Sequence, residues 1–200
     1  PWNPYSGSEP LRARLEAALR FWVGMQNTDG RFSEYGWQRW NLAATAFATK
    51  FMAETLRLLH DGPPIDQALY EEVRQAQRKA IMATLTYPDL YSHGLRFTNQ
   101  FGNVWPAILA YLQMFPDEEM EVQFRRRLND AKTAFQSPAG YYYESDSVDW
   151  GYNMGTHRHN TRMVWHYGRS SDVIDIFVEG ERLWYEWLSY NAVREPDGSA

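Results

Sequence analysis

Helical periodicity runs through almost the whole chain, and the predicted helices are of two alternating kinds. Apolar side chains recur every three or four residues, as on the buried face of an α-helix, and no segment shows the two-residue alternation of a strand. Apolar or small-residue helices are predicted at 41–59, 104–115 and 150–167. Helices with one charged face are predicted at 65–85, 117–135 and 172–190, after a first helix from Glu9 to about Asn27. The sequence therefore predicts an all-α fold.

The pairing of the two kinds of helix predicts the architecture. Each apolar helix and the charged helix after it would form a hairpin of roughly 50 residues, a period typical of helical repeat proteins. The apolar helices would make an inner layer and the charged helices an outer layer, so the apolar ones should be the more buried. We therefore expect residues 1–200 to form a single domain of helical hairpin repeats, arranged as an α/α toroid or an arc of one.

Two loops of the chain echo one another. Gly30, Glu34 and Trp40 recur as Gly140, Glu144 and Trp150, with a constant offset (140 − 30 = 144 − 34 = 150 − 40 = 110). In each copy the loop leads into a predicted apolar helix. We expect the loops 28–40, 92–103 and 138–150 to lie side by side at the N-terminal ends of these helices, where unpaired N–H groups favour anions.

Composition excludes several classes of function. Twenty basic and 25 acidic residues give a net charge of −5, which argues against general binding to nucleic acid or to a membrane surface. The chain has no cysteine, so it has neither disulfides nor thiolate metal sites. Aromatic residues make up 16% of the chain, and aromatic rings stack on sugars as well as filling cores.

The segment 140–167 concentrates the residues with chemical potential. It holds His157, His159 and Asn160, and the stretch from 150 to 171 contains no acidic residue. The three arginines of that stretch therefore form a local positive region, which predicts a site for an anionic ligand. They are Arg158, Arg162 and Arg169.

Three short phrases resemble the toroidal modules of glycan-active proteins, especially heparinase II/III-like and alginate-lyase-like polysaccharide lyases. They are Asp29-Gly-Arg-Phe-Ser-Glu34-Tyr, Thr98-Asn99-Gln100 and Tyr143-Glu144…Asp149-Trp-Gly151-Tyr152, each leading into a helix. The resemblance implies an α/α toroid that cleaves uronic-acid-containing polysaccharide by β-elimination, without a cofactor. It also implies an acidic glycan as the partner, an extracellular or periplasmic location, and a β-rich domain after the toroid.

Elimination beside a uronate needs a donor that neutralises the carboxylate, a base for the α-proton and an acid for the leaving oxygen. Asn160, His159 and Arg162 are candidate neutralisers, His157 or His159 is a candidate base, and Tyr152 is a candidate acid or base. Helical spacing predicts that Tyr152 and His159 share one face and the arginines another, and we favour the Tyr152 face. The alternative is that the histidines are hydrogen-bonded in a structural wall. Because residues 157 and 159 point in different directions on a helix, no metal site is predicted.

The acidic residues of the two loops allow a different reaction. Two of the carboxylates Glu34, Glu144, Asp146 and Asp149 on one cavity could hydrolyse a glycosidic bond. We instead expect Glu34 and Glu144 to hold their loops by accepting from helix N–H groups, and we leave Asp149 open. A glycoside hydrolase and a non-catalytic binding module therefore stay as alternatives.

Aromatic and amide side chains near the loops are candidates for sugar binding. The predicted substrate-binding residues are Trp40, Trp150, Asn99, Gln100, Trp105 and Asp149, together with Arg162. Asn103 is expected to cap the helix whose first turn contains Pro106.

Overall fold

The structure, a computed structural model, describes residues 3–36, 38–145, 147–168, 170–193 and 195–197. Its described residues confirm the all-α fold, because they form helices joined by loops and their only β-type pairing is in isolated bridges. The helices are α1 (Glu9–Gly24), α2 (Leu42–His60), α3 (Gln67–Thr86), α4 (Pro88–Arg96), α5 (Thr98–Phe101), α6 (Val104–Met114), α7 (Glu118–Thr133), α8 (Trp150–Tyr152), the π-helix η1 (Asn153–His157), α9 (Arg158–Tyr167) and α10 (Ser171–Asn191).

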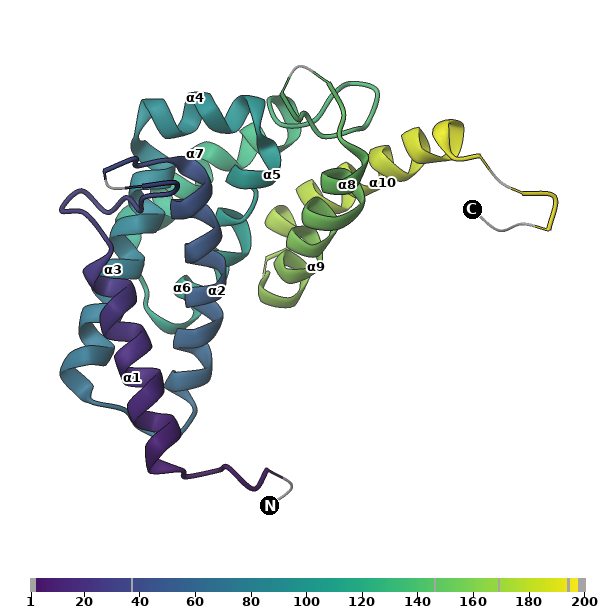
Figure 1. Cartoon of the computed structure of the whole chain (residues 1–200). Helices are drawn as coiled ribbons and strands as arrows, with labels where there is room; N and C mark the ends of the chain where they lie inside the picture. Colours follow the sequence, from purple (N-terminus) through teal and green to yellow (C-terminus); the bar gives the residue numbers. More distant parts are fainter. Residues whose placement is uncertain (1–2, 37, 146, 169, 194, 198–200) are drawn as a thin grey trace.

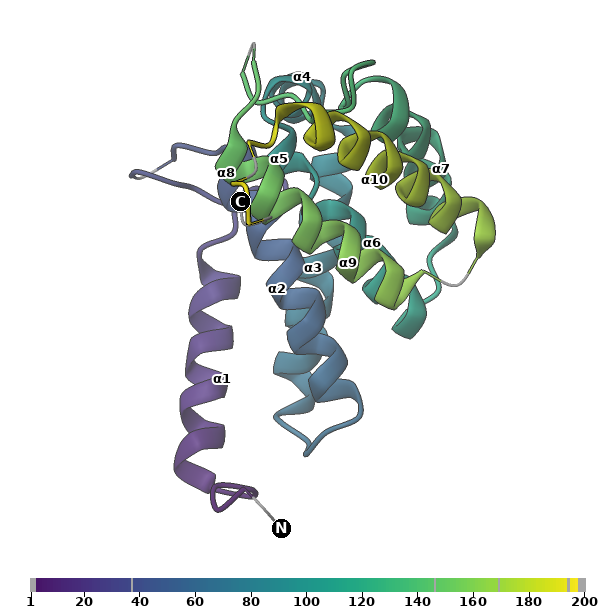
Figure 2. The same ribbon diagram turned by 90° about the vertical axis from the view of Figure 1, so that its right-hand side faces the viewer.

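The long helices form two layers (Figures 1 and 2). In one layer α6 packs between α2 and α9. In the other, α3 packs against α1 and α7, and α7 packs against α10. The layers contact each other because α3 also packs on α2 and α10 also packs on α9. The two kinds of helix predicted from the sequence therefore lie in separate layers.

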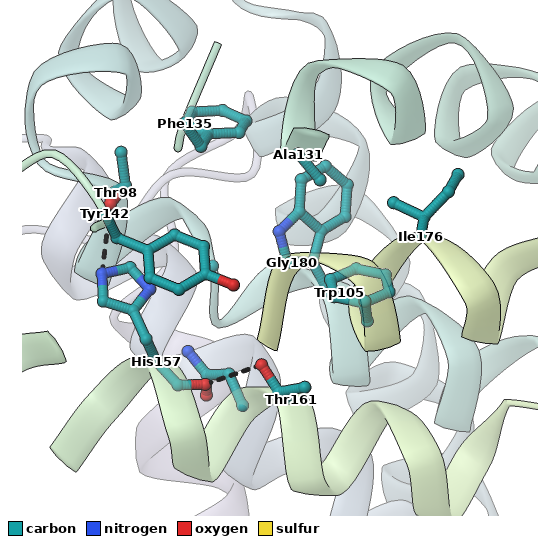
Figure 3. A pocket seen from close by; sticks show the side chains of 12 residues that line it. Thr98, Trp105, Ala131, Phe135, Tyr142, His157, Thr161, Ile176 and Gly180 are labelled. Atoms are coloured by element: carbon teal, nitrogen blue, oxygen red, sulfur yellow. Dashed lines mark hydrogen bonds between the residues drawn. The ribbon is translucent and has the colours of Figure 1, made fainter. Parts of the chain in front are cut away.

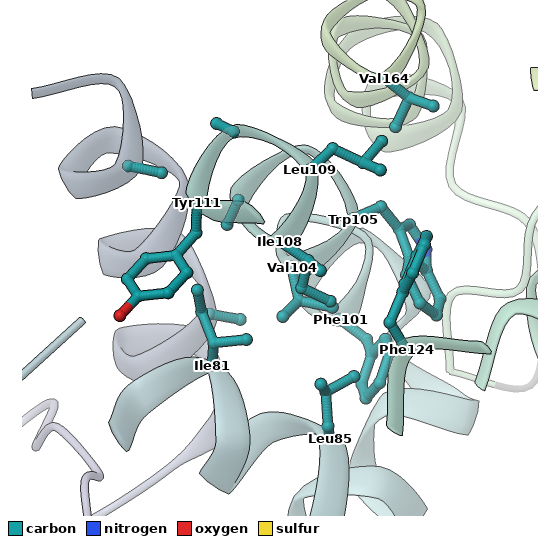
Figure 4. Close-up of a cluster of buried hydrophobic side chains, with 14 of the residues drawn as sticks. Ile81, Leu85, Phe101, Val104, Trp105, Ile108, Leu109, Tyr111, Phe124 and Val164 are labelled. Carbon is teal, nitrogen blue, oxygen red and sulfur yellow. The ribbon is translucent and has the colours of Figure 1, made fainter. Parts of the chain in front are cut away.

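Helix α6 is the centre of the hydrophobic core (Figure 4). Every residue from Val104 to Tyr111 is buried, because α2, α3, α7 and α9 surround the helix. Aromatic rings pack around its first turn, with the Phe101 and Trp105 centroids 5.3 Å apart. Burying an aliphatic or aromatic side chain of this size stabilises a fold by roughly 1.5–3 kcal/mol.

The predicted difference in burial between the layers is confirmed for one hairpin and wrong for another. Helix α6 is almost entirely buried, whereas α7 buries only Met120, Phe124 and Leu128. Helix α3, however, buries a larger share of its residues than α2 does. The reason is that α3 is packed by α1, α2, α4 and α7, whereas the side of α2 opposite α6 is open.

Helix starts follow the predicted capping chemistry in only some places. The Asn41 side chain accepts from Ala44 N at 2.9 Å, as expected for an N-cap. Ser8 and Ser170 occupy the N-cap positions of α1 and α10, and neither makes a side-chain capping bond, although serine is a favoured N-cap residue. The prediction for Asn103 is also wrong, since its Nδ2 instead donates to the Asn99 and Gln100 carbonyls.

The predicted loop at 92–103 is wrong, because that stretch is mostly helical. Pro88 occupies the first turn of α4, where the absence of its N–H costs no hydrogen bond. Helix α5 follows at once, with the Asn99 N–H accepted by the Glu144 side chain at 2.7 Å.

The echo of the two loops is structural. Gln26 Nε2 donates to the Gly30 carbonyl at 2.9 Å and to the Ala76 carbonyl of α3 at 2.8 Å. Gln136 Nε2 repeats this pair of bonds, to Gly140 at 2.7 Å and to Gly180 of α10 at 2.8 Å. We call each arrangement a glutamine clamp. These two glutamines have the same offset (136 − 26 = 110) and were not predicted from the sequence.

The three loop regions lie at one end of the molecule, as predicted (Figures 1 and 2). Arg31 pairs with Asp89 of α4, with Nη1 3.1 Å from the carboxylate. On the other side, Phe97 and Glu144 form a backbone bridge. Loop 28–40 and loop 138–150 therefore flank the α4–α5 region.

Candidate functional site

A buried polar network joins loop 138–150 to α5 and η1, and Figure 3 shows three of its members, Thr98, Tyr142 and His157. His157 Nε2 is 3.0 Å from Glu144 Oε1 and 3.1 Å from the Thr98 hydroxyl. The imidazole stacks on the Tyr142 ring, with centroids 4.3 Å apart and an interplanar angle of 12°. Burial lowers the pKa of His157, although Glu144 opposes the shift, so the ring is neutral at pH 7.

Lys50 crosses from α2 to α9 and is the least expected residue of the region. Its Nζ donates to Asn160 Oδ1 at 2.9 Å, and both residues are buried. The Phe51 ring centroid lies 5.0 Å from the ammonium, within the range of a cation–π contact. Burial lowers the pKa of Lys50 to about 8, because the charged form loses hydration. At neutral pH Lys50 is therefore a buried positive charge between α2 and α9.

His159 is exposed on α9, one residue before Asn160. Its pKa is lowered by partial burial, then by the charges of Lys50 and Arg162. A neutral imidazole beside two cations can accept a proton, and a bound carboxylate would pair with the cations. His159 and Arg162 therefore make a chemically plausible pair for an acidic ligand.

A groove of about 300 Å³ between α9 and α10 contains both residues. Its lining also includes Arg158, whose guanidinium bonds to the Tyr185 hydroxyl, and the half-exposed ring of Trp165. Glu181 forms part of the wall, and burial raises the pKa of its carboxyl. The expectation that His159 and the arginines lie on separate faces is wrong here, since one groove contains His159, Arg158 and Arg162.

The π-helical turn η1 bears on the other part of that expectation, that Tyr152 and His159 share one face. Its i→i+5 hydrogen bonds wind fewer degrees per residue than an α-helix does, so the register changes between Tyr152 and His159. Tyr152 is half exposed at the start of the helix, and its hydroxyl lies within electrostatic range of Tyr35 in loop 28–40. The α-helical spacing that placed Tyr152 and His159 on one face does not apply across η1.

A small cavity of about 30 Å³ lies next to the network (Figure 3). Tyr142, His157 and Asn160 form its polar side, and the Trp105 ring closes it. Asn160 Nδ2 is buried there with no hydrogen-bond partner among the described residues. The space is sufficient for about one water molecule.

The remaining predicted binding residues are dispersed. Trp105 is a core residue, and Asn99 is buried with its N–H bonded to Glu144. Gln100 Oε1 lies 3.1 Å from His93 Nε2. The Trp150 ring packs against Trp187, with centroids 4.8 Å apart. Trp40 lines a different groove, between α1 and α2.

The described carboxylates of the loops accept hydrogen bonds from helix N–H groups and from a capping side chain. Glu144 accepts from a helix N–H, as expected, whereas Glu34 accepts from the Asn41 side chain at 3.1 Å. Asp149, which we left open, caps α8 by accepting from Tyr152 N at 2.9 Å. Asp146 and Arg169 lie outside the described residues.

Neither Lys50 nor Glu181 was predicted as a site residue from the sequence. Lys50 gave a signal, since it is a single charge in a run of Ala, Thr and Phe residues that was predicted to be buried. Glu181 gave none, because it lies in a helix with several other acidic residues. No group of three His, Asp or Glu side chains in the described part of the chain could hold a metal ion. None of the described helices is long and apolar enough to cross a membrane.

Comparisons of the chain with protein families, with curated proteins and with solved structures find no match.

Proposed function

We propose that the chain is an arc of an α/α toroid and acts on uronic-acid-containing glycans by β-elimination. One observation carries the proposal: the exposed imidazole of His159 lines one groove with Arg162, and its pKa is lowered by partial burial and then by the charges of Lys50 and Arg162. A neutral base beside two cations matches what elimination next to a carboxylate requires.

Each residue has a defined part in this proposal. Arg162 pairs with the uronate carboxylate. Lys50, held by Asn160, adds a second positive charge that acts on His159. His159 takes the proton next to the carboxylate, and the electron pair left behind forms the carbon–carbon double bond. The glycosidic oxygen leaves with a proton. The donor predicted from the sequence, Tyr152, is exposed and lies two residues before Met154, the first residue of the groove lining. His157 is not assigned a catalytic part, because it is buried and bonded to Glu144.

Elimination is tested by the ultraviolet absorbance of the new conjugated double bond. The chain is incubated with alginate, heparin, hyaluronan and polygalacturonate in turn. The wild type should raise the absorbance with at least one polymer, and His159→Gln should reduce that rate by ~10²-fold or more. His166→Gln is the matched control, since it changes another exposed histidine of α9 and should keep the rate.

Two results would reject the proposal. One is no rise in absorbance with any of the polymers for the wild type. The other is a His159→Gln variant that keeps full activity with unchanged circular dichroism.

A glycoside hydrolase is a second candidate, supported by Glu181. Its buried carboxyl has a raised pKa, as a general acid requires, and it lines the groove with His159. Hydrolysis releases new reducing ends without new absorbance, so a reducing-sugar assay on the same samples separates the two reactions. Glu181→Gln should abolish activity only if the reaction is hydrolysis.

A further inference from the structure

A groove of about 730 Å³ lies between α1, α2 and loop 28–40, on the opposite side of α2 from α6. Its apolar lining includes Trp22, Met25 and Trp40, with the small residues Ala44 and Ala48 along α2. Among the described residues that line it, none carries a charge. The groove is therefore distinct from the cationic α9 region and unsuited to an acidic glycan.

The region around loop 138–150, the second copy of the repeat, shows which side chains fill the corresponding space there. The first groove has Met25 and Phe32 in its lining, and the same offset leads to Phe135 and Tyr142 (135 − 25 = 142 − 32 = 110). These two line the small cavity, where only about 30 Å³ is left. The Trp105 ring of α6 lies against Phe135, with centroids 6.1 Å apart.

Helices α5 and α6 thus occupy in the second repeat the space that is open in the first. One matched pair differs in exposure, since Phe135 is 3% exposed and Met25 is 43% exposed, whereas Phe32 and Tyr142 are buried in both repeats. The Phe101 ring stacks on Phe135 at 4.9 Å, so two aromatic residues one turn apart fill the space. The open side of α2 is also apolar further along, where Phe51 and Leu58 are more than half exposed.

We propose that the groove between α1 and α2 is a docking site for an apolar α-helix of a partner polypeptide. The partner helix carries two aromatic residues one turn apart, placed as Phe101 and Trp105 are on α5 and α6. Ala44 and Ala48 let its backbone approach α2 closely, and Trp22 and Met25 contact its aromatic rings. This is recognition of a helix in a groove, with the contacts of α6 as the template.

Isothermal titration of the full chain with a stapled helical peptide tests the proposal. The peptide has the sequence of residues 98–114, with added lysines for solubility and the staple on the side away from the aromatic pair. We expect saturable binding to the wild type. Met25→Glu should weaken it at least 10-fold, because a carboxylate would be buried against an aromatic ring. Ala44→Trp should weaken it as much by filling the groove without adding charge.

Controls separate docking from general apolar adsorption. Val122→Glu changes an exposed valine of α7, outside the groove, and should leave the affinity unchanged. A peptide with Trp105 replaced by Ala should bind at least 10-fold more weakly. The proposal is overturned if the wild type shows no saturable binding or if Met25→Glu binds as tightly as the wild type. It is also overturned if alginate oligosaccharide, and not the peptide, binds in a manner that Met25→Glu abolishes.

Discussion

Lys50 is an ammonium group held by an amide oxygen in a buried position. The cost of removing its charge from water is reflected in its pKa of about 8, against 10.5 for an ordinary lysine. A group of this kind destabilises the folded state whenever it is protonated there. Its retention at the α2–α9 contact fits the proposed role in attracting an anion.

The linkage between this pKa and stability gives the first prediction. Below pH 8 the lysine is protonated in both states and the folded state carries the full cost. Between pH 8 and 10.5 the unfolded chain holds the proton and the folded chain does not, so the free energy of unfolding should rise with pH. The slope is at most about 1.4 kcal/mol per pH unit. Lys50→Met should lack this contribution in urea unfolding at pH 7, 8.5 and 10.

Lys132→Met removes an exposed lysine of α7 and serves as the control for that measurement. Its free energy of unfolding should rise with pH as steeply as that of the wild type, because the tyrosines and Lys50 are unchanged in this variant. Equal slopes for Lys50→Met and the wild type would contradict the assignment of the lowered pKa.

The sequence could predict only part of the candidate site. It pointed to the segment 140–167, and His159 and Arg162 do line a groove in it. The sequence could not separate His159 from His157, because burial by Glu144 and Tyr142 is a tertiary feature. It could not place Lys50 beside Asn160 either, since the two are 110 positions apart in the chain.

Among the elements, the two Gly loops are the parts in which the sequence was most informative. Gly30 and Gly140 both have positive φ, 93° and 110°, which a side chain tolerates poorly. An added Cβ would lie 2.6 Å from the Lys79 carbonyl oxygen at the first site and 2.2 Å from that of Leu183 at the second. Glycine is therefore required at each position for two reasons, the positive φ and the lack of space for a Cβ.

This geometry gives a second prediction. Gly30→Ala and Gly140→Ala should each lower the free energy of unfolding by about 1–3 kcal/mol, because of backbone strain and the displaced outer helix. Urea unfolding monitored by circular dichroism measures the effect. Gly155→Ala is the matched control, since a Cβ there meets no atom within 4 Å. A loss for Gly155→Ala as large as for the loop variants would contradict the explanation.

Other elements could not be predicted because several structures suit the same residues. Pro88 can follow a helix or open one, and only the packing of α4 against α3 and α5 decides. The π-helical turn η1 has no sequence signature that we recognise. An α-helical pattern predicted the helix but not its change of register.

At the scale of the whole molecule, the layers differ in how completely they are enclosed. Helix α6 is surrounded by other helices, whereas α1 buries only Leu19 and packs chiefly on α3. Local opening is easiest where few apolar contacts are lost. Stability should therefore decrease from the centre of the array toward α1.

Native-state hydrogen exchange tests this third prediction. Amides of α6 should exchange only by global unfolding, and those of α1 should exchange at least ~10²-fold faster through local opening. The C-terminal part of α3, which is buried beside α6, should resemble α6 and serves as the internal reference. Protection of α1 equal to that of α6 would show that the chain unfolds as one unit.

The alternation of apolar and charged helices was sufficient to predict the all-α fold and its two layers. It could not predict that α3 would be more enclosed than α2, because that depends on which side of α2 is covered. The toroid itself remains a proposal. Its support is that three helices of one layer lie in sequence order beside one another.

The glutamine clamps have a consequence for how such repeats diverge over evolutionary time. Each clamp uses one glutamine side chain, and its acceptors are backbone carbonyls, on Ala76 in one repeat and Gly180 in the other. Any residue supplies a carbonyl, so the bond itself does not fix the residue of the outer helix, and only space limits it: a Cβ at Gly180 would lie 3.1 Å from Gln136 Oε1. Two duplicated units can therefore drift until little beyond the glutamine, the glycine and a few loop residues is shared. In such a chain the shared hydrogen-bond geometry would still indicate common ancestry of the two units after their sequence similarity has become undetectable.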